Sequence, residues 1–115
     1  MAEQVAKAVV KNTHGCPIEG LMEVVGGKWK PIILYYLSIK TQRFGELKRL
    51  IPNVSQRMLT QHLRELEAHG IVHREIYQEV PPRVEYSLTE LGRTFETLLI
   101  QMNHWAEEYL VPAGE

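Results

Sequence analysis

The hydrophobic period of the chain changes at Gly70, and this change restricts the possible folds more than any other feature. Before Gly70, apolar residues recur at helical spacing behind Ser55, a favoured N-cap residue, and the glycine itself ends the helix. After it, apolar and polar residues alternate over 72–80 and 83–88, on either side of Pro81-Pro82. The alternation predicts a β-hairpin with a proline-containing turn. Because an isolated two-stranded hairpin is only marginally stable, we expect it to pack against helices.

Glycine and proline divide the preceding part of the chain into short amphipathic segments. Pro17 fits the first turn of one helix, and Gly26-Gly27 ends that helix. In a short third helix, Leu47, Leu50 and Ile51 are expected to face the core. The helices that we expect in this part of the chain span residues 3–11, 17–25, 28–39, 45–51 and 56–69.

The C-terminal segment predicts the longest helix, which begins after Thr89 and ends near Leu110. Its apolar residues are spaced alternately by three and four positions, a stripe typical of a helix that contacts another helix. At 1.5 Å per residue this helix would be roughly 33 Å long, more than twice the roughly 13 Å radius of a globule of this size. We therefore expect one of its two apolar sides to contact a second chain, through Leu98, Met102, Trp105 and Tyr109.

Charge is distributed unevenly along the chain, although the formal net charge is only −1. Residues 40–64 contain six Lys or Arg and one Glu, whereas residues 87–115 contain one Arg and five Glu. A near-neutral protein can still present a local positive field where its basic residues gather. The basic segment is therefore a candidate surface for an anionic partner.

The order of elements predicts an α+β, mostly α, winged helix-turn-helix. The helices over 45–51 and 56–69 are joined by a tight turn, and the hairpin follows them as the wing. A major groove about 12 Å wide admits one α-helix, and Leu59, Leu63 and Leu66 would hold that helix against the core. Its opposite face bears side chains that bond to bases, since Gln suits adenine, Arg suits guanine and Thr suits several bases. Contacts with double-stranded DNA are expected from Ser55, Gln56, Arg57, Thr60, Gln61 and Arg64.

Other basic residues flank this motif and are better placed to contact phosphates, which position a protein on DNA without reading its sequence. Arg83, at the predicted wing tip, would enter the adjacent minor groove. The phosphate contacts are expected from Lys40, Arg43, Lys48 and Arg49.

Six short blocks of sequence follow one another along the chain. They are GGKW at 26–29, RFGELK at 43–48, SQRMLT at 55–60, LRELE at 63–67, VPPRVEY at 80–86 and LTELG at 88–92. In order and spacing these blocks resemble those of the HxlR-type bacterial transcriptional regulators, a group of MarR-like winged helix-turn-helix proteins. The resemblance extends over roughly residues 16–110, and the blocks together are highly specific.

The resemblance implies a homodimer that binds operator DNA and dimerises through extended terminal helices. We expect a transcriptional repressor on a pseudo-palindromic operator whose half-sites lie roughly 34 Å apart. In this interpretation residues 1–115 form one domain. It comprises an N-terminal arm (1–15), a DNA-binding core (16–88) with the wing at about 72–88, and a dimerisation helix (89–110).

Cys16 is the only cysteine, and it precedes Pro17 at a predicted helix N-terminus. The helix dipole and the free N–H groups there favour a thiolate, which a protonated His14 would promote and Glu19 would oppose. A buried, unreactive thiol is the alternative. Several members of the resembled family have a Cys-Pro pair here and use its cysteine to sense oxidants, quinones or aldehydes. The resemblance thus implies that an oxidant or a small electrophile acts on Cys16 and changes DNA affinity, for example through a disulfide to the partner's Cys16.

The remaining histidines and the absence of catalytic motifs argue against other chemistry. No metal or cofactor is expected, because neither His14 with Cys16 nor His69 with His73 has a second close-set pair. His62, between the two faces of its helix, is expected to be a hydrogen-bonded packing residue. The chain has no Gly-rich phosphate loop and no Asp, so we do not expect an enzyme.

The apolar stretches of the chain are only a few residues long, too short for a membrane span or a secretory signal. A cytoplasmic protein is therefore the simplest interpretation. Two alternatives to a thiol-based regulator stay open. One is a winged-helix regulator that responds to a small ligand between its subunits, without thiol chemistry. The other is a winged-helix module that binds protein.

Overall fold

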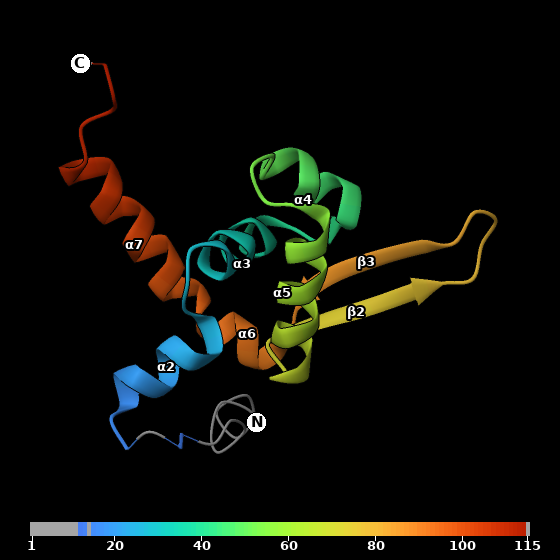
Figure 1. Ribbon diagram of the computed structural model, residues 1–115, viewed down its shortest axis with the longest axis horizontal. Helices are drawn as coiled ribbons and strands as arrows, with labels where there is room; N and C mark the ends of the chain where they lie inside the picture. The colour runs from blue at the N-terminus through green and yellow to red at the C-terminus, as the bar shows by residue number, and fades with distance from the viewer. Residues whose placement is uncertain (1–11, 14, 115) are drawn as a thin grey trace.

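The computed structural model describes residues 12, 13 and 15–114 and has a winged helix-turn-helix fold, mostly helical with one small sheet (Figure 1). The helix expected over residues 3–11 lies outside the described residues. The helices are α2 (Pro17–Val25), α3 (Trp29–Ile39), α4 (Phe44–Leu50), α5 (Gln56–Ala68), α6 (Glu90–Thr94) and α7 (Glu96–Tyr109). The strands are β1 (Gln42–Arg43), β2 (Val72–Tyr77) and β3 (Arg83–Leu88).

The core lies where α3 and α5 pack against each other and against the base of the sheet. α3 is apolar around most of its circumference, and Ile33, Leu34 and Leu37 are at most 2% exposed. Burying each such side chain contributes roughly 1.5–3 kcal/mol. The buried hydrophobic residues are Val25, Ile33, Leu34, Leu37, Leu47, Ile51, Val54, Leu59, Leu63, Leu66, Ile71, Val72, Leu88 and Leu99.

α4 differs in one respect from its sequence-based prediction. Leu47 and Ile51 are buried as expected, but Leu50 is exposed, so the prediction that it faces the core is wrong. α4 ends at Leu50, and Ile51 leaves helical geometry with φ −125° and ψ 71°. The buried pair is therefore Leu47 and Ile51, four residues apart, and Leu50 lies outside it.

The sheet has three antiparallel strands in the order β1-β3-β2, where the sequence predicts only a hairpin. β1 pairs Gln42 with Tyr86, and two residues are too few to produce an alternating pattern. Gln42 is buried, and its side-chain Nε2 donates to the Tyr36 carbonyl oxygen at 3.2 Å. β1 therefore joins the edge of the wing to the end of α3.

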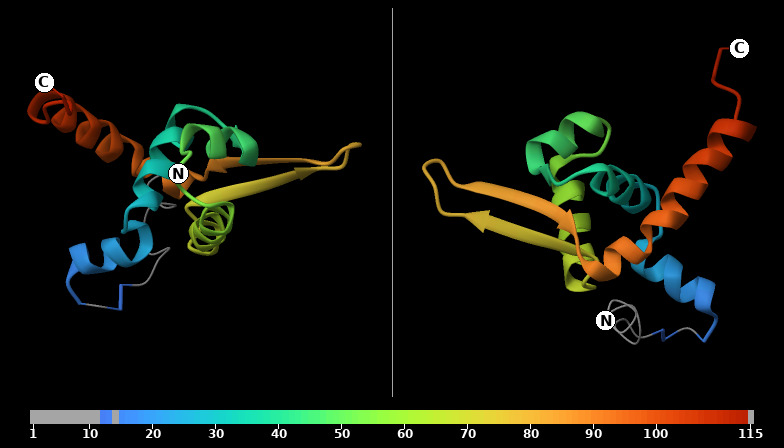
Figure 2. Two further views of the ribbon diagram at one scale, coloured as in Figure 1. Left: turned by 45° about the horizontal axis from the view of Figure 1, so that its top comes forward. Right: turned by 180° about the vertical axis from the view of Figure 1, so that it is seen from behind.

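The hairpin of β2 and β3 extends away from the helices on the side opposite to α7 (Figures 1 and 2). Its strands are in register from the pair Val72 and Leu88 at the base to Tyr77 and Arg83 at the far end. β2 ends at Tyr77 instead of Val80, because residues 78–82 form the connecting loop. The wing is therefore a projecting arm rather than part of the core.

The C-terminal region forms two helices, so the single helix predicted from Thr89 to Leu110 is wrong. A tight turn at Phe95, whose N–H donates to the Gly92 carbonyl oxygen at 3.1 Å, separates α6 from α7. α6 packs closely against the residue that precedes β2, since a side chain at Gly92 would collide with the Ile71 carbonyl oxygen. α7, with 14 residues, then leaves the body in another direction (Figure 2).

Candidate nucleic-acid interface

α4, α5 and the turn between them form the predicted helix-turn-helix. α4 begins with a capping interaction in which the Arg43 N–H donates to Glu46 Oε1 at 2.7 Å. In the turn, Val54 is 1% exposed and belongs to the hydrophobic core. α5 begins where the Met58 N–H donates to Ser55 Oγ at 3.1 Å, which confirms the N-cap predicted from sequence.

The two sides of α5 differ as predicted. Leu59, Leu63 and Leu66 are at most 1% exposed and anchor the helix to the core. The opposite side, which we call the reading face, lies along a shallow groove. The residues that line this groove are Gln56, Arg57, Thr60, Gln61, Arg64, Glu65 and Ala68.

The hydroxyl of the N-cap residue Ser55 and that of Thr60 on the reading face both form hydrogen bonds within the protein. Ser55 Oγ accepts the N-cap hydrogen bond, and Thr60 Oγ1 donates to the Gln56 carbonyl oxygen at 2.9 Å. Thr60 therefore presents its methyl group and a remaining lone pair rather than its hydroxyl proton. The long side chains of Gln56, Arg57 and Arg64 are exposed.

His62 packs between the faces of α5, as expected, but the prediction that it is hydrogen-bonded is wrong. Both ring nitrogens are buried, and neither has a hydrogen-bond partner among the described residues. The Nδ1 atom lies 3.7 Å from Glu65 Oε1, beyond hydrogen-bonding distance.

Glu65 is a groove residue that sequence reasoning missed. Its Oε1 lies 2.8 Å from the Nζ of Lys30, and its Oε2 accepts a hydrogen bond from Gln61 Nε2 at 3.2 Å. These two contacts, Lys30 first, lower the pKa of Glu65 to about 2. The spacing of four residues from Gln61 is a local signal that a sequence reading could use. Lys30 comes from α3 and has no such signal.

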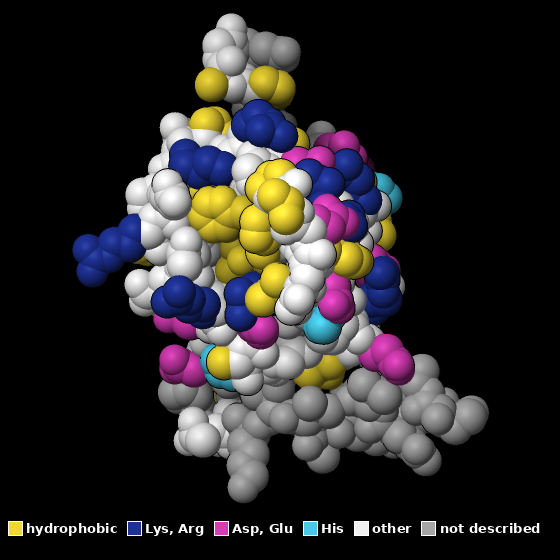
Figure 3. All heavy atoms as spheres, turned by 90° about the vertical axis from the view of Figure 1, so that its right-hand side faces the viewer, with side chains coloured by type: hydrophobic (Ala, Val, Ile, Leu, Met, Phe, Trp, Pro, Cys, Tyr) yellow, Lys and Arg dark blue, Asp and Glu magenta, His cyan; other side chains and the backbone are white. Residues whose placement is uncertain are grey.

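The predicted phosphate-contacting residues lie on and beside α4. Lys40, Arg43 and Arg49 are exposed, whereas Lys48 is half-buried and donates from Nζ to the Pro52 carbonyl oxygen at 3.1 Å. Lys40 Nζ lies 3.6 Å from Glu46 Oε2, so part of its charge is neutralised locally. Figure 3 views the molecule from the side toward which the wing points, and Lys and Arg side chains surround the hydrophobic centre of that face.

Arg83 lies at the first position of β3, beside the loop rather than at its end. Its guanidinium lies 2.9 Å from the carboxylate of Glu79 and 2.7 Å from that of Glu85, and it stacks 3.9 Å from the ring centre of Tyr77. These carboxylates, Glu79 first, raise the pKa of Arg83. A contact of Arg83 with DNA would have to compete with both of them.

Cys16 is the N-cap residue of α2, and its side chain is exposed. Pro17 occupies the first turn of that helix, as predicted, and the Gly20 N–H donates to the Cys16 carbonyl oxygen at 3.1 Å. Exposure argues against the alternative of a buried thiol. His14 lies outside the described residues.

α7 has one buried and one exposed side. Leu99 packs into the core at 4% exposure. The other side bears an apolar stripe in which Trp105 and Tyr109 have their ring centres 5.3 Å apart. The apolar stripe consists of Leu98, Met102, Trp105 and Tyr109, which are 47%, 53%, 59% and 63% exposed.

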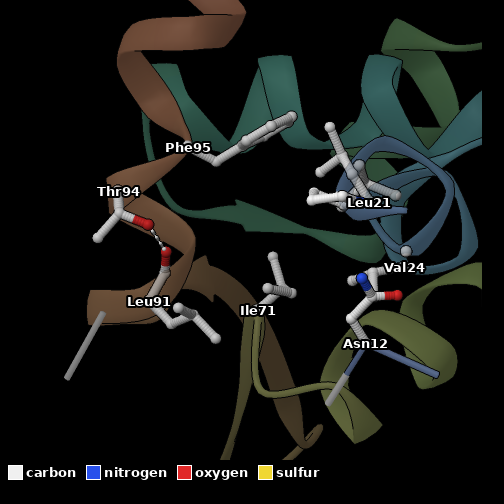
Figure 4. Close-up of a pocket in the computed structure, with 10 residues that line it drawn as sticks. Asn12, Leu21, Val24, Ile71, Leu91, Thr94 and Phe95 are labelled. Atoms are coloured by element: carbon white, nitrogen blue, oxygen red, sulfur yellow. Dashed lines mark hydrogen bonds between the residues drawn. The ribbon is translucent and has the colours of Figure 1, made fainter. Parts of the chain in front are cut away.

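An apolar cavity of about 320 Å³ lies between α2 and α6 (Figure 4). Leu21 and Val24 face it from α2, Leu91 and Phe95 face it from the other wall, and Ile71 lies between them. Among the described lining residues, Thr94 has a hydroxyl, which donates to the Leu91 carbonyl oxygen, and Asn12 has an amide; the other lining residues are apolar side chains and Gly20. The cavity therefore suits a small apolar molecule better than a polar one.

Within the described residues, no group of three or more His, Cys, Asp or Glu side chains is arranged to hold a metal ion. None of the helices in this part of the chain is long and apolar enough to span a membrane.

Comparison with known proteins gives consistent results. The profile of the HxlR-like helix-turn-helix family matches residues 24–113. YybR, an uncharacterized HTH-type transcriptional regulator of Bacillus subtilis (strain 168), is 54% identical over 101 residues, which cover 88% of this chain and 81% of YybR. The solved structure of the redox regulator HypR in its oxidized form is 54% identical, with a TM-score of 0.81, and the match covers 84% of this chain and 100% of that one. The structure of HypR in its reduced form is 55% identical, with a TM-score of 0.77, and the match covers 81% of this chain and 92% of that one.

Proposed function

Because this chain belongs to the HxlR-like helix-turn-helix family of transcriptional regulators, we propose that it represses transcription as a homodimer bound to a specific operator and releases DNA when Cys16 is modified. As a transcriptional regulator of this family it would bind DNA and would not be an enzyme. Residues 1–115 would act as one domain in the cytoplasm, with residues 16–88 binding DNA and 89–110 joining the subunits.

The observation that supports DNA binding most directly is the construction of α5. Its inner side is fully buried, so the helix is rigidly held, and its outer side presents amide and guanidinium groups along an open groove. Rigid support matters because base discrimination depends on fixed hydrogen-bond geometry. Glu65, the acid in this groove, is already engaged by Lys30 and Gln61.

The apolar stripe of α7 supports the homodimer. Four large side chains about half exposed on one helix form a surface of the kind that a second chain covers. A two-fold dimer would present two copies of α5 to successive turns of the major groove, and its operator would be pseudo-palindromic.

The exposed thiol of Cys16 and the similarity to a redox regulator, HypR, support control by oxidants or electrophiles. In the oxidation step, two Cys16 thiols from two subunits lose two protons and two electrons and form one disulfide. Diamide, an azo compound, accepts them and becomes the corresponding hydrazine. Addition to a quinone or an unsaturated aldehyde would instead form one carbon–sulfur bond at each thiolate; the C=C π bond of the electrophile is lost, and the resulting enolate takes up a proton from water.

Fluorescence anisotropy of a labelled duplex from upstream of the protein's own coding region tests this proposal, with random DNA as competitor. We expect the reduced parent protein to bind tightly and to lose this binding after diamide treatment. The Cys16→Ser variant should still bind tightly in the presence of diamide. Tight binding that diamide leaves unchanged in the parent protein would contradict the thiol step. Failure of a selection from random duplexes to yield any preferred sequence would contradict operator binding and favour a protein-binding module.

The cavity between α2 and α6 favours a second candidate, a regulator that responds to a small apolar ligand without thiol chemistry. A ligand there would contact Ile71, next to the end of α5, and Phe95, at the turn into α7. Loss of operator binding caused by such a ligand in the Cys16→Ser variant would establish this candidate. Leu91→Trp, which fills the cavity, should abolish that response.

A further inference from the structure

A chain of polar contacts connects the core to the reading face. Lys30 lies on α3 with a side chain only 10% exposed, and its Nζ lies 2.8 Å from Glu65 Oε1. The second oxygen of the same carboxylate, Oε2, accepts the hydrogen bond from Gln61 Nε2 at 3.2 Å. One carboxylate thus joins a buried ammonium group to a residue that faces the groove.

This arrangement determines which way the amide of Gln61 is turned. An ionised carboxylate can only accept hydrogen bonds, so the amide group that faces Glu65 must be the NH2 rather than the carbonyl. The contacts with Lys30 and then Gln61 lower the pKa of Glu65 to about 2, so the carboxylate is ionised at neutral pH. The second N–H of Gln61 and its Oε1 are left for another partner.

A donor and an acceptor side by side on one amide complement the major-groove edge of adenine, which offers N7 as acceptor and the N6 amino group as donor. We propose that Glu65, anchored by Lys30, is a positioning residue that turns Gln61 for bidentate recognition of adenine. This inference rests on the proposed function, because it concerns how the same α5 surface selects its operator.

A merely structural role for the pair makes a different prediction. If Lys30 and Glu65 only held α5 against α3, removing either would weaken binding to every DNA sequence together. A positioning role instead predicts a loss of preference at one base pair in each half-site, with the preferences at other positions retained. The distinguishing measurement is therefore the base preference at each position and not the overall affinity.

The test begins with selection of binding sites from random duplexes by the unaltered protein and by Gln61→Ala, which identifies the adenine position that depends on Gln61. Glu65→Gln, which keeps the shape but can present either a donor or an acceptor to Gln61, should lower the preference for adenine there on the order of tenfold. The matched control is Glu67→Gln on the same helix, whose carboxylate lies 3.6 Å from Arg74 of the wing. It should leave that preference unchanged.

Lys30→Met provides a second variant, since it frees Glu65 without touching the groove, and it should weaken the same adenine preference. Thermal unfolding of each variant shows whether it is folded at the assay temperature. An unchanged preference in Glu65→Gln, or a Gln61-dependent position that is not adenine, would overturn the inference while leaving operator binding intact. Failure of the unaltered protein to select any sequence would instead overturn the proposed function.

Discussion

Two exposed helix surfaces of this molecule differ in how firmly their side chains are held. On the reading face of α5, Gln61 is bonded to Glu65 and Thr60 to a main-chain carbonyl. On the apolar stripe of α7, the side chains are 47–63% exposed, and the ring contact between Trp105 and Tyr109 joins two of them. Polar recognition depends on direction and benefits from groups fixed in advance, whereas burial of apolar area is non-directional. This difference agrees with the proposal that α5 contacts DNA and that α7 contacts a second copy of the chain.

The largest effect is expected from the buried side of α5, because the reading face depends on it. Leu63 is 1% exposed, and Leu63→Ala should lower the free energy of unfolding by roughly 2–5 kcal/mol through lost burial and a residual cavity. Urea denaturation measures this change. Ile76→Ala, at a half-exposed position of the wing, is the control and should change stability by less than about 1 kcal/mol. Equal effects of the two substitutions would contradict the described packing of α5.

Met102→Glu should disrupt the apolar stripe of α7 while leaving the reading face of α5 unaltered, so the roles of the two surfaces can be tested independently. It places a charge in the centre of the apolar stripe, so the dimer should dissociate and operator affinity should fall on the order of 100-fold as the two half-sites are no longer bound together. Analytical ultracentrifugation and anisotropy measure the two effects. The matched control is Gln101→Glu, which adds the same charge at the neighbouring exposed position of α7. A Met102→Glu protein that remains dimeric would remove the apolar stripe from the proposed interface.

Within the proposed DNA-binding surface, substitutions on α5 and on α4 should have different effects on specific and non-specific binding. Arg57→Ala should reduce specific binding by roughly 1–3 kcal/mol while leaving binding to random DNA nearly unchanged, since Arg57 would contact base edges. Lys48→Ala should weaken both kinds of binding and reduce the dependence of affinity on salt concentration, because its contacts would be with phosphates. Titrations at several salt concentrations on both kinds of DNA make the comparison. Equal losses on the two DNAs for Arg57→Ala would exclude it from base recognition.

The features that could be predicted from sequence are those determined by neighbouring residues. The N-cap at Ser55, the buried leucines of α5 and the alternating strands of the wing follow from spacing along a single segment. The turn at Phe95 was missed because the apolar spacing continues across it, from Leu91 through Phe95 to Leu98, as it would in one helix. The strand β1 was missed because two residues show no period.

The site shows the same limit. The groove-lining side chains of α5 follow from helical spacing, and the structure places five of the six predicted residues along one groove, with Ser55 at the N-cap. The ion pair between Lys30 and Glu65 joins helices distant in sequence, so no local pattern predicts it. Arg83 combines both cases: Glu79 and Glu85 are close to it in sequence, whereas Tyr77 reaches it only because the hairpin pairs these two residues across its strands.

The smallest expected effect is the contribution of the ionised Glu65 carboxylate to the stability of the fold. The pKa of Glu65 is about 2 in the folded chain against an ordinary value of 4.5. Its ionised form therefore stabilises the fold at pH values above about 4.5, and this contribution is lost as the pH falls from 4.5 toward 2. Because the Glu65 side chain is 40% exposed, solvent screening should limit the contribution to less than about 1 kcal/mol.

The difference in unfolding free energy between the parent protein and Glu65→Gln isolates this contribution from those of other carboxylates. At pH 7 the parent should have the larger free energy of unfolding, and the difference should decrease toward zero near pH 2. A difference that stayed constant over this range would mean that shape alone, and not charge, holds Glu65 between Lys30 and Gln61. The side chains of the reading face would then be held in place by packing, as in the core. They would differ from those of the apolar stripe only in their degree of burial.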